Sequence, residues 1–86
     1  MNYFVIVDVT LRQGIADPEG ATIERALPAL GFRGVSNVKA GKSFRMSIDA
    51  ASEGEALGKA TALAERLLSN PVIEDAAARL GETVAP

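Results

Sequence analysis

The chain has no cysteine and no histidine among its 86 residues. Without cysteine it forms no disulfide, and without both residue types it lacks the usual ligands of zinc, iron–sulfur and haem sites. The same absences exclude a cysteine–histidine pair and a serine–histidine–aspartate triad. Any catalysis would rest on carboxylates, lysines or the single tyrosine, and the sequence places no two carboxylates at a shared pocket. We therefore predict no catalytic, cofactor-binding or metal-binding residue in this chain.

The chain also has fewer basic than acidic residues: it contains nine lysines and arginines and eleven acidic residues, so its formal net charge is −2. That balance argues against general affinity for nucleic acid or anionic membranes. The only N-terminal apolar stretch, residues 3–9, is short, contains Asp8 and lacks a basic leader. We expect a cytoplasmic chain with no nucleic-acid partner and no membrane partner.

The length predicts one domain, over residues 1–80, with a frayed tail over residues 81–86. A domain of this size buries only about 60–65% of its unfolded surface and is marginally stable. Small domains usually gain stability from disulfides, metal ions or partners. Because the first two are excluded here, we expect the chain to form a homo-oligomer.

Residues 3–11 alternate with a period of two, which predicts a β-strand. Tyr3, Val5, Val7, Val9 and Leu11 share one face of it. Phe4 and Ile6 share the other face, which should be polar if water covered it. Either this is an N-terminal edge with two exposed apolar groups, or the face meets another protein. We favour the second interpretation and assign Phe4 and Ile6 to an oligomer interface.

Residues 18–30 predict a helix that begins after the capping residue Asp17 and ends at Gly31. Pro28 removes one backbone hydrogen bond, so the last turn should kink or end early. Phe32 is expected to fold back onto the helix end. The helix should pack on the sheet through an apolar stripe. Its members are Ile23, Ala26, Leu27 and Leu30.

Residues 35–49 have a strand-like pattern that Gly41 divides, so they predict either one bent strand or two strands joined near residues 40–42. Residues 36–43 nearly match the phosphate-binding pattern Gly-x-x-x-x-Gly-Lys-Ser. However, Ser36 replaces the first glycine, and the pattern leads into a strand instead of the helix that would hold phosphate. We therefore interpret Gly41 and Lys42 as a turn.

The second helix starts at a predicted capping box, in which Ser52 satisfies the Glu55 amide and Glu55 reaches back. Asn70 and Pro71 should end it, and its buried stripe is Leu57, Ala60, Ala64, Leu67 and Leu68. Residues 72–80 are ambiguous between strand and helix. The order of elements predicts an α+β fold of ferredoxin-like type, with two helices on one face of an antiparallel sheet.

Residues 25–48 contain five basic side chains and no acidic one. One interpretation is a set of solvated strand edges, where lysine also discourages stray strand pairing. The other is a basic rim that faces an acidic partner surface and steers association. The candidate residues for a partner-facing rim are Arg33, Lys39, Lys42 and Arg45.

Four segments together resemble the small PurS subunits of bacterial phosphoribosylformylglycinamidine synthase. They occur in that family's order and spacing and cover roughly three quarters of the chain. Pro28 and residues 75–80 depart from the family pattern, although the resemblance weakly favours a strand at the end. The segments are Val9-Thr10-Leu11-x-x-Gly14, Asp17-Pro18-x-Gly20 with Ile23-x-Arg25-Ala26-Leu27-x-x-Leu30-Gly31-Phe32, Val35-Ser36-x-Val38-x-x-Gly41-Lys42, and Leu67-Leu68-x-Asn70-Pro71-Val72-Ile73-Glu74.

The resemblance implies a variant of the ferredoxin-like fold and a non-catalytic role in a glutamine-dependent, ATP-consuming ligase complex of purine biosynthesis. In that family, a paired small subunit bridges a glutaminase subunit, which releases ammonia, and a synthetase subunit, which uses ATP and magnesium. This chain alone would bind no cofactor. The alternatives are a regulatory module of ferredoxin-like type that binds a small ligand at a dimer interface and, less favoured, an independent enzyme.

Overall fold

The sheet of this protein is antiparallel and has the strand order β2-β1-β3 in the computed structural model, which describes residues 1–82. β1 (Asn2–Leu11) is central, and β2 (Gly41–Asp49) and β3 (Glu74–Leu80) are its neighbours. Two α-helices, α1 (Pro18–Ala26) and α2 (Glu53–Leu63), follow β1 and β2 in the chain. The predicted α+β class with an antiparallel sheet is confirmed.

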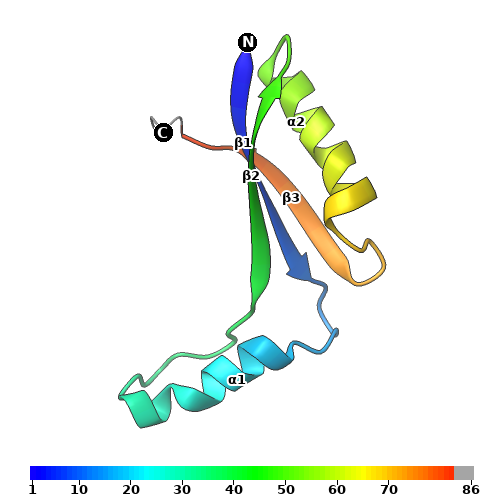
Figure 1. Cartoon of the computed structure of the whole chain (residues 1–86). Helices are drawn as coiled ribbons and strands as arrows, with labels where there is room; N and C mark the ends of the chain where they lie inside the picture. The colour runs from blue at the N-terminus through cyan, green and yellow to red at the C-terminus, as the bar shows by residue number, and fades with distance from the viewer. Residues whose placement is uncertain (83–86) are drawn as a thin grey trace.

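β1 supplies the centre of the hydrophobic core, because its alternation places three valines on one face. Val5, Val7 and Val9 are fully buried. Burial of each valine contributes about 1.5–3 kcal/mol to the free energy of unfolding. α2 covers this face of the sheet (Figure 1) and approaches it closely, because small side chains lie between them. These side chains are Ala56, Ala60 and Ala64 of the helical segment and Ala76 and Ala78 of β3.

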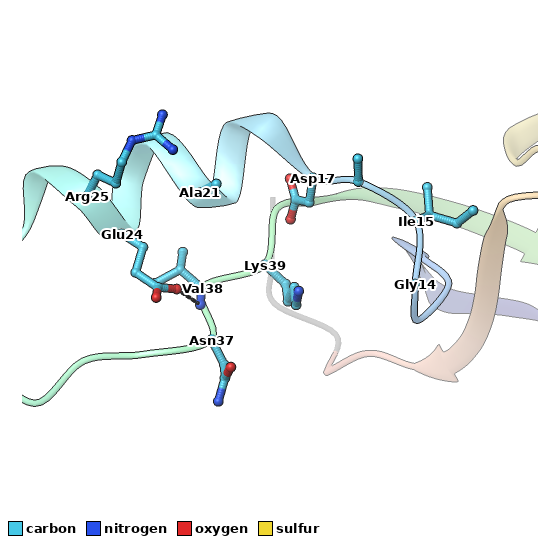
Figure 2. A pocket seen from close by; sticks show the side chains of 10 residues that line it. Gly14, Ile15, Asp17, Ala21, Glu24, Arg25, Asn37, Val38 and Lys39 are labelled. Atoms are coloured by element: carbon cyan, nitrogen blue, oxygen red, sulfur yellow. Dashed lines mark hydrogen bonds between the residues drawn. The ribbon is translucent and has the colours of Figure 1, made fainter.

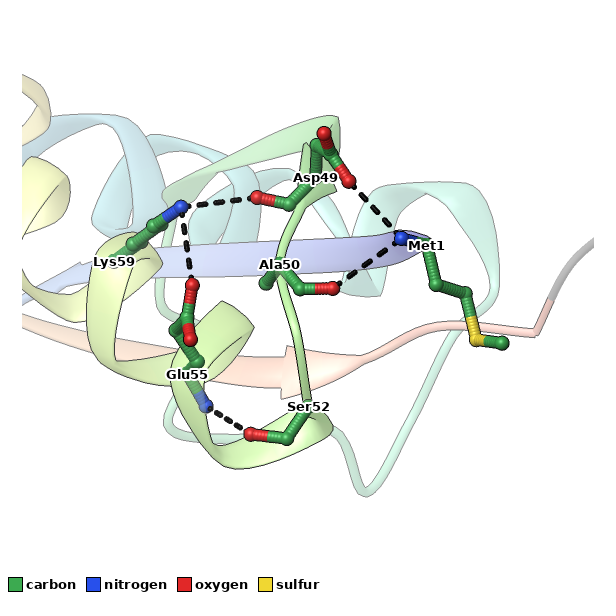
Figure 3. Close-up of polar contacts among 6 residues, drawn as sticks. All are labelled: Met1, Asp49, Ala50, Ser52, Glu55 and Lys59. Atoms are coloured by element: carbon green, nitrogen blue, oxygen red, sulfur yellow. Dashed lines mark hydrogen bonds and ion pairs between the residues drawn. The ribbon is translucent and has the colours of Figure 1, made fainter.

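The start of α2 differs in one bond from the predicted capping box. The Glu55 N–H donates to Ser52 Oγ at 3.1 Å, as predicted. Instead of reaching back to Ser52, the Glu55 carboxylate pairs with Lys59 Nζ at 3.4 Å (Figure 3), one turn further along the helix. The Lys59 ammonium also donates to the Asp49 carbonyl oxygen at 3.0 Å. Glu55 and Lys59 thus tie α2 to the end of β2.

The second helix ends in a turn that is wider than α-helical. Ala64–Leu68 forms a π-helical turn, η2, and Ser69 donates from both its N–H and its Oγ–H to the Ala64 carbonyl oxygen. Leu67 is 74% exposed, whereas Leu68 packs against the core. The predicted burial of Leu67 is therefore wrong, because a stripe drawn at α-helical spacing does not continue through a π turn.

α1 lies beyond the end of the sheet instead of on its face (Figure 1). It begins as predicted, because Asp17 Oδ1 accepts a hydrogen bond from the Gly20 N–H at 2.9 Å. It ends early as predicted, and the chain continues after Leu27 in a short 3-10 turn, η1 (Pro28–Leu30). The predicted placement of two helices on one face is corrected: of the two described helices, only α2 covers that face.

The projecting segment over residues 12–40, which we call the arm, leaves its apolar side chains exposed. Ile23 is 45% exposed and Leu30 is 69% exposed. The Phe32 N–H donates to the Leu27 carbonyl oxygen, so the chain folds back onto the helix end as predicted, although Phe32 stays 57% exposed. The radius of gyration is 16.1 Å, compared with about 12 Å for a compact domain of this length.

Residues 35–40 form neither the bent strand nor the hairpin that the sequence allowed. β2 begins only at Gly41. Asn37 has φ 58°, a left-handed conformation that interrupts an extended run. The next amides, of Val38 and Ala40, donate to side chains of the arm. The carboxylates of Glu24 and Asp17 therefore accept the hydrogen bonds that the carbonyl oxygens of a neighbouring strand would otherwise accept.

β3 resolves the ambiguity over residues 72–80 in favour of a strand. Its alanines fit beneath α2, and its register with β1 runs from Glu74 opposite Leu11 to Leu80 opposite Val5. The Gly81 N–H donates to the Phe4 carbonyl oxygen at 2.9 Å, so backbone contact with β1 continues into the predicted tail. Residues 83–86 of that tail lie outside the described residues. A single domain over residues 1–80 stays a prediction.

Candidate functional site

The face of the sheet opposite α2, which we call the outer face, carries Phe4 and Ile6 as the alternation predicts. The register places Ile6 between Arg45 of β2 and Arg79 of β3. Ile6 is only 9% exposed, and Phe4 is half-buried. A Cβ atom at Gly81 would overlap the Phe4 ring, so the residue that follows β3 already lies against part of this surface. The role of Phe4 and Ile6 in an oligomer interface stays a prediction.

The two arginines of the outer face differ in their partners. Arg79 Nε donates to Asp8 Oδ2 at 3.1 Å. This hydrogen bond, followed by one from Ser43, lowers the pKa of the Asp8 carboxyl. Arg45 forms no ion pair within residues 1–82, so its charge is available to a partner.

The structure does not gather the predicted basic rim into one surface. Arg33 lies three residues after the end of η1, and Lys39 lies two residues before the start of β2. Lys42 pairs with Glu74 at 3.7 Å. Arg45 is on the outer face, opposite Ile6 in the register. Contact of these residues with a partner stays a prediction.

A hydrophobic surface on the arm was not predicted as a site. It consists of Ile23, Leu27 and Leu30, and we call it the arm stripe. The sequence signal was present, because these residues follow helical spacing. That spacing shows that a helix has an apolar face, but it does not show whether the same chain or another one covers it. In this structure Ile23 and Leu30 stay largely exposed.

A groove lies where the arm joins the sheet (Figure 2). It comprises two adjoining cavities of about 680 and 500 Å³, which share five lining residues. The larger cavity is bounded by α1 and the residues before β2, and the smaller one by the end of β1 and the loop that follows it. We call this the hinge groove, and the shared residues are Gly14, Ile15, Asp17, Asn37 and Lys39.

Two carboxylates in the wall of the hinge groove hold backbone amides. Asp17 accepts from the Gly20 N–H and from the Ala40 N–H, each at 2.9 Å. These two hydrogen bonds, in that order of size, lower the pKa of the Asp17 carboxyl. Glu24 Oε1 accepts from the Val38 N–H at 2.9 Å (Figure 2). The two carboxylates therefore hold residues 37–40, which we call the strap, next to α1.

The described residues offer no metal centre of the usual kind. Within residues 1–82, no three acidic side chains gather closely enough to hold a metal ion. None of the helices in this part of the chain is long and apolar enough to cross a membrane. The sites that the geometry does present are surfaces: the outer face, the arm stripe and the hinge groove.

Comparison with known proteins identifies the family of the chain. The family model "PurS: Phosphoribosylformylglycinamidine (FGAM) synthase" matches residues 4–82. A PurS subunit of this synthase from Archaeoglobus fulgidus is 44% identical over 68 residues, which is 79% of this chain and 85% of the relative.

Solved structures agree with the sequence comparison. The crystal structure of the PurS subunit from Thermotoga maritima aligns with a TM-score of 0.87 at 31% identity, over 94% of this chain and 93% of that one. A chain in the structure of PurLQS from the same organism aligns with a TM-score of 0.86 at 31% identity, over 94% and 99%. The chain therefore belongs to the PurS family of phosphoribosylformylglycinamidine synthase subunits.

Proposed function

We propose that this chain is the non-catalytic bridging subunit of phosphoribosylformylglycinamidine synthase in purine biosynthesis. It couples a glutaminase subunit, which releases ammonia, to a synthetase subunit, which uses ATP and magnesium. The observation that carries the proposal is the alignment of 94% of the chain with a chain in the PurLQS structure of Thermotoga maritima. The absence of histidine and cysteine supports it, because a bridging subunit needs binding surfaces and no nucleophile.

The proposal gives the chain no cofactor of its own and neither a nucleic acid nor a membrane as partner. ATP and magnesium belong to the synthetase subunit of the complex. The cytoplasmic location is also part of the proposal, and it rests on the place of the reaction in purine biosynthesis. The partners are the two larger subunits and a second copy of this chain.

Self-association is supported by the shape of the chain and by what it leaves exposed. An arm that projects from the sheet cannot cover its own apolar side chains, and Ile23 and Leu30 remain exposed on it. A second copy that covered the arm stripe would bury these side chains, and each fully buried side chain is worth about 1.5–3 kcal/mol. The outer face, with Phe4 and Ile6, is the second surface proposed for assembly.

Complex formation between purified proteins tests the bridging role. The tagged chain is mixed with the glutaminase and synthetase subunits of the same organism, singly and together, and the mixtures are separated by size-exclusion chromatography. The proposal expects a species that contains all three proteins only when this chain is present. Coelution of the two larger subunits without this chain, and the same elution with it, would overturn the bridging role.

A further inference from the structure

The direction in which the arm leaves the sheet is not set by packing. In the described part of the chain, α1 makes no extensive contact with any strand. Ile23 and Leu30, which a packed helix would bury, are 45% and 69% exposed. A segment with few buried apolar contacts moves easily unless polar contacts restrain it. The direction of the arm therefore depends on the polar contacts at its base.

The base of the arm is the place where its two connections to the sheet come together. The chain leaves β1 at Leu11 and enters β2 at Gly41, which lies opposite Thr10 in the register. A Cβ atom at Gly41 would lie 2.7 Å from the Val9 carbonyl oxygen, so the backbone at this glycine lies close against β1. Ala40 directly precedes Gly41 and is therefore held at the end of the sheet.

One carboxylate connects the start of α1 to this end of the sheet. Asp17 Oδ1 accepts from the Gly20 N–H at 2.9 Å, and Asp17 Oδ2 accepts from the Ala40 N–H at 2.9 Å. The first bond caps the helix, whereas the second fixes the capped end to the residue before β2. Because each oxygen has its own amide, the two functions of the side chain are separable.

Gly20 permits this close approach. It is buried, and a Cβ atom at this position would lie 2.5 Å from the Val38 carbonyl oxygen and 2.6 Å from Asp17 Oδ2. A larger residue would therefore push the strap away from α1. The glycine of the motif Asp17-Pro18-x-Gly20 is thus explained by the contact between the helix start and the strap.

We propose that Asp17 is a positioning residue that fixes the direction of the arm relative to the sheet through its bond to the Ala40 N–H. The arm stripe and the outer face lie on the two parts of the chain that this contact connects, so it sets the spacing between them. That consequence for assembly rests on the proposed function, whereas the direction of the arm is a property of the chain itself. We call the residues that form the contact the arm joint: Asp17, Gly20, Ala40 and Gly41.

The bond to Ala40 can be removed while the helix cap is kept. Asparagine and serine are good N-cap residues, but each has a single side-chain oxygen. Asp17→Asn and Asp17→Ser should therefore keep the bond from Gly20 and lose the bond from Ala40. Glu19→Ala is the matched control, because it also removes one carboxylate from the first turn of α1 and Glu19 is exposed.

The lack of cysteine allows the direction of the arm to be measured with spin labels. Ala26→Cys on α1 and Ala62→Cys on α2 place two labels at exposed positions. Labelled chain is diluted with an excess of unlabelled chain, so that the distances recorded lie within one chain. We expect the distance distribution of both Asp17 variants to be at least about twofold broader than that of the wild type, and that of Glu19→Ala to be unchanged.

Amide hydrogen exchange separates a joint from a general structural role. In both Asp17 variants the Ala40 amide should exchange about fivefold faster, while the amides of Gly20 and of β1 keep their protection. A wild-type distance distribution in both variants would overturn the inference, and so would equal broadening in Glu19→Ala. Loss of protection in β1 in both variants would also overturn it, because Asp17 would then support the sheet itself.

The consequence for assembly is tested separately by light scattering on the same variants. Weaker self-association of the Asp17 variants would support the role of the joint in spacing the two surfaces. Wild-type self-association with a broadened distance distribution would overturn that role and leave the joint in place. If the wild-type chain does not self-associate, that part of the proposed function fails, and the distance measurement still decides whether Asp17 positions the arm.

Discussion

The Val38 N–H donates to Glu24 Oε1 at 2.9 Å, across a separation of fourteen residues. This bond and its neighbour, from the Ala40 N–H to Asp17 Oδ2, bind the strap to α1. In a β-sheet the same amides would bond to carbonyl oxygens of an adjacent strand. The two carboxylates therefore explain why a strand-like sequence before Gly41 remains outside the sheet.

Replacement of Glu24 by alanine should loosen the strap without unfolding the sheet. The lost hydrogen bond to a charged acceptor is partly exposed, so its contribution is about 1 kcal/mol. Hydrogen exchange at the Val38 amide should then accelerate about fivefold, while the β1 amides keep their protection. Glu19→Ala is the matched control, because Glu19 lies on the same helix and is exposed. Unchanged exchange at Val38 would contradict the assignment.

Acidification should release the strap through Asp17. The pKa of Asp17 is lowered in the folded chain by hydrogen bonds from Gly20 and Ala40, whereas the unfolded value is about 3.9. The stabilisation is therefore fully present above the unfolded pKa and is lost as pH falls through the lower, folded pKa. Amide exchange at Gly20 and Ala40, corrected for its intrinsic pH dependence, should lose protection below about pH 4, and Asp17→Asn should remove this pH dependence.

Local signals were enough to predict most elements of this fold. Asp17 and Ser52 mark the helix starts, Pro28 marks the early end of α1, and alternation marks β1. Each of these signals acts over a few residues, so the sequence shows it directly. The π turn that exposes Leu67 is a local feature that the pattern did not reveal.

The placement of the arm and the hinge groove beside it could not be predicted from local signals. They depend on pairs such as Glu24 with Val38 and Asp17 with Ala40, which are distant in sequence and have no periodic signature. The spacing of Ile23, Leu27 and Leu30 predicted an apolar helix face, but Ile23 and Leu30 stay exposed, so the predicted packing of this face on the sheet is wrong. The spacing alone cannot show what covers such a face, and the hinge groove exists only once the arm is in place.

The arm stripe should be required for self-association. Leu30→Asp places a charge on a side chain that is 69% exposed, so the isolated subunit should fold normally. If a second copy buries this side chain, dimerisation should weaken by about 1.5–3 kcal/mol. Light scattering over a concentration series measures the change, with Ala29→Asp on the same turn as the control. Equal dissociation constants for Leu30→Asp and the wild type would exclude this residue from the interface.

A separate prediction concerns the role of the outer face in assembly. Phe4→Asp should weaken assembly while the helical signal in circular dichroism is retained, since α2 packs on the opposite face of the sheet. Ala62→Asp is a suitable control, because Ala62 is exposed on α2, which packs on the other face of the sheet. Unchanged assembly of a folded Phe4→Asp chain would mean that Phe4 does not lie in the interface.

The bridging role predicts that loss of this chain affects two ammonia sources unequally. The synthetase chemistry belongs to another subunit, and free ammonia at high concentration can reach that subunit from solvent. Ammonia from glutamine needs the glutaminase to be held beside the synthetase, and this advantage of proximity is lost with the bridge. A reconstituted mixture without this chain should therefore lose most glutamine-dependent synthesis and keep a larger share of ammonia-dependent synthesis.

Product formation is measured with glutamine or an ammonium salt, with and without this chain. Adding the chain back should restore the glutamine-dependent rate, and the chain alone should show neither glutaminase nor ATPase activity. Equal loss of both activities on omission would mean that this chain supports the synthetase itself, and loss of neither would remove the coupling role.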